Sequence, residues 1–182
     1  MKSREIRSKI TDQAKLELSI EKIEVKKPVG SEVLIKMQAS PINPSDIGLL
    51  IASANPTTLK KIRGAYPKVS MDIDKSHLSF FAKRLNKSLA VGNEGAGKVI
   101  DAGKDSKHLI GKIVSVSGGS TFSQYKCTDS FNCIEMKKGI TSKKASSAFI
   151  NPLTALGMVE TCKIEGHGAI IHTAAASSLG QM

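Results

Sequence analysis

The sequence predicts a mostly β domain that is followed by the beginning of an α/β unit. Most of the first 140 residues form short segments in which apolar and polar side chains alternate, as expected for strands with one buried face. Nearer the C-terminus, a helical pattern, a short apolar run and a turn of small residues follow one another. This succession is typical of the first strand and turn of a parallel α/β domain.

The predicted strands are separated by turns that contain glycine or proline. They cover residues 14–25, 32–40, 97–101, 112–116 and two pieces of 120–134. The first two strands follow each other directly across the Val29-Gly30 turn, which suggests an antiparallel start.

Two further segments have helical spacing. Asn43 is a favourable N-cap, and Pro44 suits the first turn of a helix whose apolar side chains lie at 47–51. A longer helical pattern covers residues 141–161. Proline lacks a backbone N–H, so we expect one helix to end and another to begin at Pro152.

Residues 57–89 have the weakest pattern and are interpreted as an exposed insertion. Gly64 and Pro67 mark turns within it. Residues 76–86 have helical spacing with Ser76 at the N-cap position, which predicts a short amphipathic helix.

The C-terminal turn has the features of a dinucleotide-binding site. The apolar run at 168–173 is expected to be a fully buried strand. The pattern Ala174-x-x-Ser177-x-x-Gly180 follows it, and such small residues let the backbone approach a pyrophosphate at a helix N-terminus. Because the sequence stops at Met182, we interpret it as the N-terminal portion of a longer protein.

Composition and charge exclude several classes of protein. The hydrophobic fraction of 40% and the charged fraction of 24% are typical of a globular protein. The net charge is +11, but the lysines are scattered and only 4% of the residues are aromatic. We therefore expect a solvated lysine-rich surface and no nucleic-acid partner.

No apolar stretch is long enough to span a membrane, and the N-terminus lacks the apolar core of a secretory signal. These observations favour a cytoplasmic protein with no membrane partner. The three cysteines, at 127, 133 and 162, match no metal-binding spacing and are interpreted as free thiols.

Three segments together resemble a known superfamily. Residues 39–46 read ASPINPSD, residues 91–97 read VGNEGAG, and residues 149–155 read FINPLTA. In this order, with the C-terminal turn, they resemble the medium-chain dehydrogenase/reductase superfamily, and in particular its zinc-free quinone oxidoreductase and 2-enoyl thioester reductase branches.

The resemblance implies two domains. Residues 1–140 would form a GroES-like β-barrel that carries the substrate side, with the insertion at about 57–89. Residues 141–182 would form connecting helices and the start of a truncated Rossmann domain. The implied fold class is therefore a mostly β GroES-like barrel followed by the first strand and turn of an α/β Rossmann domain.

The resemblance also implies a reaction. The full-length protein would transfer a hydride from NAD(P)H to a quinone or to an activated enone or enoyl double bond, with NADP as the expected cofactor and NAD as the alternative. It would bind a small-molecule substrate and form a homodimer. We expect the 182-residue chain alone to show no turnover.

Zinc is not expected at this site. The zinc alcohol dehydrogenases of the superfamily have a cysteine and a histidine where this sequence has Asn43 and Asn93. A neutral amide is a poor ligand for Zn²⁺ compared with a thiolate or an imidazole.

The resemblance makes Asn43, Asp46 and Asn93 the candidate catalytic residues, each with a structural alternative. Asn43 could donate a hydrogen bond to the developing oxyanion or serve only as a helix cap. Asp46 could orient its neighbours or be a first-turn carboxylate, and Asn93 could line the pocket or belong to a turn. Glu94 is expected to be structural.

The candidate cofactor-binding residues are Thr154, Ala174, Ser177 and Gly180. Thr154 resembles a threonine that family members place beside the cofactor, although a threonine within a helix can also bond its own backbone.

One departure places the enoyl thioester reductase interpretation below the more general quinone or enone reductase interpretation. Those enzymes have a tyrosine a few residues after the Asn-Pro-Ser-Asp helix, but residues 52–56 contain none and Tyr66 lies in the insertion. Two alternatives to such a reductase are a non-catalytic GroES-like binding or structural module and a relative of the zinc alcohol dehydrogenases that has lost its metal.

Overall fold

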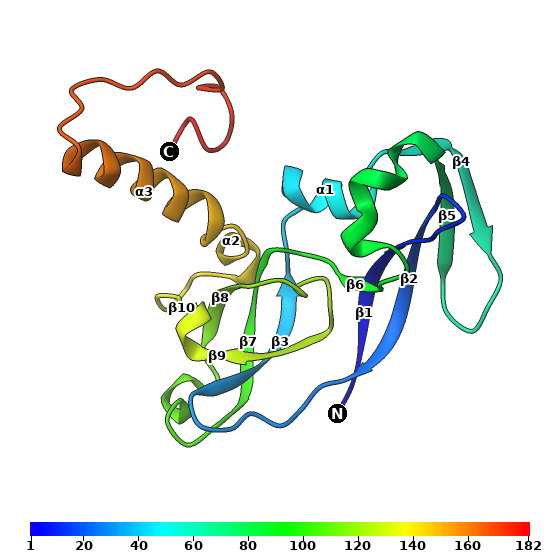
Figure 1. Ribbon diagram of the computed structural model, residues 1–182. Helices are drawn as coiled ribbons and strands as arrows, with labels where there is room; N and C mark the ends of the chain where they lie inside the picture. The colour runs from blue at the N-terminus through cyan, green and yellow to red at the C-terminus, as the bar shows by residue number, and fades with distance from the viewer.

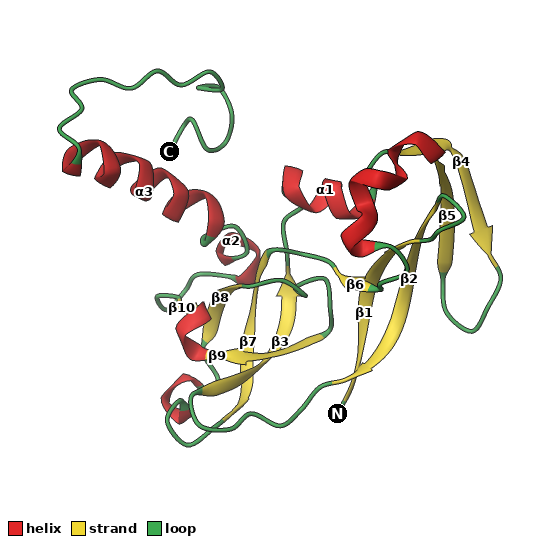
Figure 2. Ribbon diagram, in the orientation of Figure 1, coloured by secondary structure: helices red, strands yellow, loops and turns green.

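The computed structural model describes residues 1–182 and contains two five-stranded antiparallel sheets (Figures 1 and 2). The first sheet has the strand order β4-β5-β2-β1-β6. Its strands are β1 (Lys2–Ile10), β2 (Lys15–Glu24), β4 (Ala54–Ile62), β5 (Lys68–Ile73) and β6 (Leu89–Ala90). Its buried cluster consists of Ile10, Leu16, Ala54, Met71 and Ile73.

The second sheet has the order β10-β8-β7-β3-β9. Its strands are β3 (Glu32–Ala39), β7 (Glu94–Ala102), β8 (Ile113–Ser117), β9 (Tyr125–Asp129) and β10 (Cys133–Glu135). The largest buried cluster of the molecule lies on this sheet and contains Val33, Ile35, Val99, Ala102, Leu109, Val114 and Val116.

A short seam of hydrogen bonds joins the two sheets. The backbone N–H of Ile6 in β1 donates to the carbonyl of Phe122 at 3.0 Å, and that of Gln124 donates to the carbonyl of Arg4 at 2.9 Å. The loop before β9 thus pairs with β1, and these hydrogen bonds connect the two sheets along one edge.

The sequence correctly predicted strands β2, β3, β7, β8, β9 and β10, but one expectation about the sheets was wrong and β1 was missed. β2 and β3 lie in different sheets and do not pair with each other. β1 was not expected, because its buried positions carry Ser3, Glu5 and Ser8 in place of apolar residues. Buried polar side chains hide the alternation on which strand prediction depends.

The segment at 57–89 was expected to be an exposed insertion, but it forms part of the first sheet and contributes Met71 and Ile73 to that sheet's buried cluster. It contains most of β4, all of β5, and a 3₁₀ helix, η1 (Lys75–Arg84). The helix was expected, but its N-cap is Asp74, whose carboxylate accepts from the Ser76 N–H at 2.9 Å, and the expected cap at Ser76 was wrong.

The α-helices are α1 (Pro44–Leu50), α2 (Ser142–Ala145) and α3 (Ile150–Ile164). Two further 3₁₀ turns are η2 (Lys107–Leu109) and η3 (Ser130–Asn132). The break between α2 and α3 lies before Pro152, which occupies the first turn of α3, where its missing N–H costs no hydrogen bond. α2 packs against the second sheet, whereas α3 buries none of its residues and projects from it (Figure 1).

Residues 168–173 form no strand, contrary to expectation. The side chain of Ile171 is 95% exposed. A fully buried strand requires neighbouring strands on both sides to satisfy its N–H and C=O groups, and no strand of this chain lies beside the segment.

Two further observations concern membranes and thiols. No helix has the length and hydropathy needed to cross a membrane. The three cysteines are free, as expected, and burial raises the pKa of the Cys133 thiol to about 11.

Candidate functional site

The centre of the candidate site is the carboxylate of Glu94, at the start of β7. Its side chain is fully buried. Oε1 accepts a hydrogen bond from Nδ2 of Asn43 at 3.0 Å. Oε2 accepts from the backbone N–H groups of Phe149 and Ile150, at 3.1 and 2.9 Å, where α3 begins. Three donors thus offset the cost of burying this charge.

A second buried carboxylate, that of Asp46, lies in the first turn of α1. One oxygen accepts from the backbone N–H of Asn43 at 2.8 Å, as in a capping box. The other accepts from the backbone N–H of Asn93 at 3.0 Å, and the Asn93 amide donates to Ser45 Oγ at 2.8 Å. The structure therefore brings the three candidate catalytic residues together through Asp46.

The Asn43 side chain is 9% exposed and has more than one role. It occupies the N-cap position of α1, as the sequence predicted. One N–H of its amide is used on Glu94, and the other donates to no protein acceptor. The amide therefore has one donor that the chain itself does not use.

Thr121 was not anticipated from the sequence, although its side chain holds the backbone of Glu94 in place. It is 1% exposed, and its Oγ1 donates to the backbone carbonyl of Glu94 at 2.7 Å. Its N–H donates to the carbonyl of Gly92 at 3.2 Å. The signal that could have identified it is weak, because it lies 27 residues from Glu94 in a loop without a motif.

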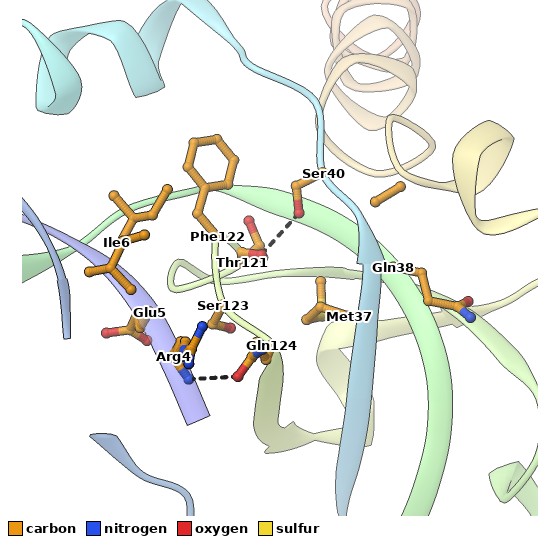
Figure 3. Close-up of a pocket in the computed structure, with 12 residues that line it drawn as sticks. Arg4, Glu5, Ile6, Met37, Gln38, Ser40, Thr121, Phe122, Ser123 and Gln124 are labelled. Carbon is orange, nitrogen blue, oxygen red and sulfur yellow. Dashed lines mark hydrogen bonds between the residues drawn. The ribbon is translucent and has the colours of Figure 1, made fainter. Parts of the chain in front are cut away.

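A pocket of about 390 Å³ lies beside this network, at the seam between the sheets (Figure 3). Figure 3 shows Ser40 and Thr121 side by side in the pocket wall, where Ser40 Oγ donates to the Thr121 carbonyl at 3.0 Å. None of the candidate catalytic residues lines this pocket. Its walls are Arg4, Glu5, Ile6, Ile20, Met37, Gln38, Ala39, Ser40, Thr121, Phe122, Ser123 and Gln124.

Of the candidate cofactor-binding residues, Thr154, Ala174 and Ser177 are exposed and Gly180 is half-buried. Thr154 Oγ1 donates to the Ile150 carbonyl at 2.7 Å. This is the bond to the backbone of its own helix that is expected if Thr154 has only a structural role. Ala174, Ser177 and Gly180 share one compact turn, in which Ser177 Oγ accepts from the Gly180 N–H at 3.1 Å. No hydrogen bond joins this turn to Asn43.

The amides at 43 and 93 lead to a prediction about zinc. Metal analysis of the purified protein is expected to find no stoichiometric zinc, because the Asn43 amide is held as a donor to Glu94 and amides are poor zinc ligands. No group of three or more His, Cys, Asp or Glu side chains has a geometry that could hold a metal ion. Stoichiometric zinc that only a strong chelator removes would contradict the prediction.

Comparisons with known proteins agree with this architecture. No protein-family model matches the chain. The chain is 28% identical, over 168 residues, to the mitochondrial enoyl-[acyl-carrier-protein] reductase of Caenorhabditis elegans, covering 90% of this chain and 41% of that protein.

Two solved structures superimpose on almost the whole chain. Both proteins are assigned as NADPH:quinone reductases, one from Mesorhizobium loti (TM-score 0.65, 24% identity) and one from Bacillus thuringiensis (TM-score 0.65, 25% identity). Each comparison covers 99% of this chain, but only 49% and 47% of the respective reductase. The chain thus spans about half the length of the proteins it resembles.

The chain therefore has the fold of the N-terminal half of medium-chain dehydrogenase/reductase proteins, which confirms the resemblance found in the sequence. Within that superfamily, its neighbours are quinone reductases and enoyl reductases.

Proposed function

We propose that this chain supplies the substrate-side half of a zinc-independent, NADP-dependent reductase that acts on a quinone or on an activated enone or enoyl double bond. The observation that carries the proposal is Asn43, whose side-chain amide donates to Glu94 and whose backbone N–H donates to Asp46, while the second amide N–H donates to no acceptor within the chain. The names of the relatives, quinone reductase and enoyl reductase, support both substrate classes.

Asn43 provides the chemistry that such a reaction needs from the protein. Hydride addition to a conjugated carbonyl places negative charge on the carbonyl oxygen, and a fixed N–H donor stabilises that charge. NADPH would supply the hydride when it is bound. Glu94 holds the amide and Asp46 holds the Asn43 backbone, so that little reorganisation is needed when the charge develops.

The C-terminal turn has the donors needed for the cofactor's phosphates. The backbone N–H groups of Ala175, Ala176, Ser178 and Leu179 donate to no protein acceptor. A Cβ atom at Gly180 would lie 2.6 Å from the Ala174 carbonyl oxygen, so only glycine permits this close turn. We propose that Ala174, Ser177 and Gly180 bind the pyrophosphate and that Thr154 lies beside the cofactor.

Three expectations stay proposals. They are the division into a barrel domain at 1–140 and a cofactor-binding part at 141–182, the homodimer, and the cytoplasmic location. The C. elegans relative is named as mitochondrial, so the location needs its own measurement.

A chimera tests the proposed function. Residues 1–182 are joined to the C-terminal part of the B. thuringiensis reductase that the chain does not cover. Oxidation of NADPH is then measured with a quinone and with a 2-enoyl thioester. Turnover by the chimera but not by the 182-residue chain alone supports the proposal. A folded chimera that binds NADPH but reduces neither substrate supports the non-catalytic module.

In this chimera, Asn43→Ala is expected to lower kcat by about 10- to 1,000-fold, because the lost donor acts mainly in the transition state. The KM for NADPH should change little. Asn132→Ala is the matched control, since it removes an amide whose Nδ2 bonds Thr128 at 3.2 Å, far along the chain from the site. Equal kcat values for the two variants would leave Asn43 without a catalytic role.

A further inference from the structure

The N-terminus of α3 lacks a cap from its own sequence. The N-cap residue is Phe149, whose side chain cannot accept a hydrogen bond. The first N–H groups of a helix have no partner within the helix and carry the positive end of its dipole. In this protein the acceptor comes from Glu94, 55 residues earlier in the chain, whose Oε2 receives both the Phe149 and the Ile150 N–H.

Glu94 is itself held rigidly. Its backbone pairs with Ser117 in the β7–β8 ladder, and its carbonyl accepts from Thr121 Oγ1. The carboxylate therefore projects from a fixed strand end. One of its oxygens faces α3 and the other faces the Asn43 amide at the start of α1.

This arrangement joins the two sides of the proposed active site. Asn43, on one side, is the proposed oxyanion donor. α3, on the other side, carries Thr154 and leads to the proposed cofactor turn. No other side chain hydrogen-bonds both to Asn43 and to α3.

We propose that Glu94 is a positioning residue that fixes the Asn43 amide and the start of α3 relative to each other. It caps α3 from across the fold with one oxygen and orients the oxyanion donor with the other. Only the expected effect on catalysis rests on the proposed function. The link that Glu94 makes between Asn43 and α3 can be measured on the 182-residue chain alone.

The first test is Glu94→Gln in the 182-residue chain. In glutamine an NH₂ group replaces one of the two carboxylate oxygens, so a donor must face either the Asn43 amide or the Phe149 and Ile150 N–H groups. The oxygen that remains carries no full negative charge to cap α3. Hydrogen exchange at the Phe149 and Ile150 amides is expected to accelerate by about tenfold or more. The matched control is Glu5→Gln, which alters another buried carboxylate, bonded to Arg7 at 2.6 Å, and should leave these amides unchanged.

A second variant separates positioning from simple loss of stability. Asn43→Asp combined with Glu94→Gln exchanges donor and acceptor: the side-chain amide introduced at position 94 can donate to the new carboxylate at position 43, and its oxygen can still face α3. This double variant should restore slow exchange at Phe149 and Ile150. In the chimera described above, Glu94→Gln should lower kcat about tenfold with little change in the KM for NADPH. The double variant should regain slow exchange but no turnover, because Asn43→Asp removes the proposed oxyanion donor.

The outcomes distinguish this inference from the proposed function. Unchanged exchange at Phe149 and Ile150 in Glu94→Gln, or no recovery of slow exchange at these amides in the double variant, would overturn the coupling. If Glu94→Gln changed the exchange at these amides but not kcat, Glu94 would be purely structural and the inference would also be overturned. Turnover by the unsubstituted chimera would in that case still support the reductase. A parent chimera without turnover would count against the proposed function alone.

Discussion

Asn43→Asp is expected to be among the most destabilising single substitutions in this protein, by about 3–5 kcal/mol at neutral pH. It replaces the donor Nδ2, 3.0 Å from Glu94 Oε1, with an oxygen, and so places two carboxylates together in a buried site. Like charges at this distance cannot both stay ionised without a large cost. Urea denaturation at neutral pH measures the loss.

The pH dependence of this variant identifies the cause. One carboxyl of the pair must take up a proton in the folded state. The difference in the free energy of unfolding between this variant and the wild type should therefore shrink as the pH is lowered. Helix capping alone predicts no loss, because aspartate caps helices about as well as asparagine. Wild-type stability of Asn43→Asp at neutral pH would therefore show that the contact with Glu94 contributes little.

Local patterns predicted the parts of the fold that depend on neighbours in the sequence. The alternation in β2, β3, β7 and β8 follows from one buried face, and the cap and first turn of α1 follow from adjacent residues. The grouping of Asn43, Asp46 and Asn93 could be predicted from the resemblance because each lies in one of its motifs. Their contacts through Asp46 then appear in the structure.

The remaining features depend on contacts between distant residues, which carry no local signal. Glu94 was expected to be structural, but nothing in the sequence indicated that it caps a helix 55 residues away. The pocket at the seam depends on the pairing of β1 with the loop at 121–125. The apolar run at 168–173 has the pattern of a buried strand, yet a strand forms only where other strands accept its hydrogen bonds.

Gly92→Ala is expected to destabilise the protein by about 2–5 kcal/mol, through two separate costs. Gly92 has φ = +96°, a conformation that a residue with a Cβ atom adopts only under strain. The added Cβ would also lie 2.4 Å from Thr121 Oγ1 and 2.7 Å from the backbone nitrogen of Phe122. Since Thr121 bonds Glu94, its displacement should disturb the site as well as the fold.

Gly118→Ala is the matched control that separates the two costs. Gly118 has a similar φ of +92°, but a Cβ atom there would meet nothing within 4 Å. The free energy of unfolding of this variant should therefore fall only by the cost of the positive φ, about 1–2 kcal/mol. Urea midpoints of the two variants measure the difference, and hydrogen exchange at Phe149 should accelerate only in Gly92→Ala. Equal losses would mean that Thr121 and Phe122 yield to the extra atom, so that the loop supporting Glu94 is more adaptable than its contacts suggest.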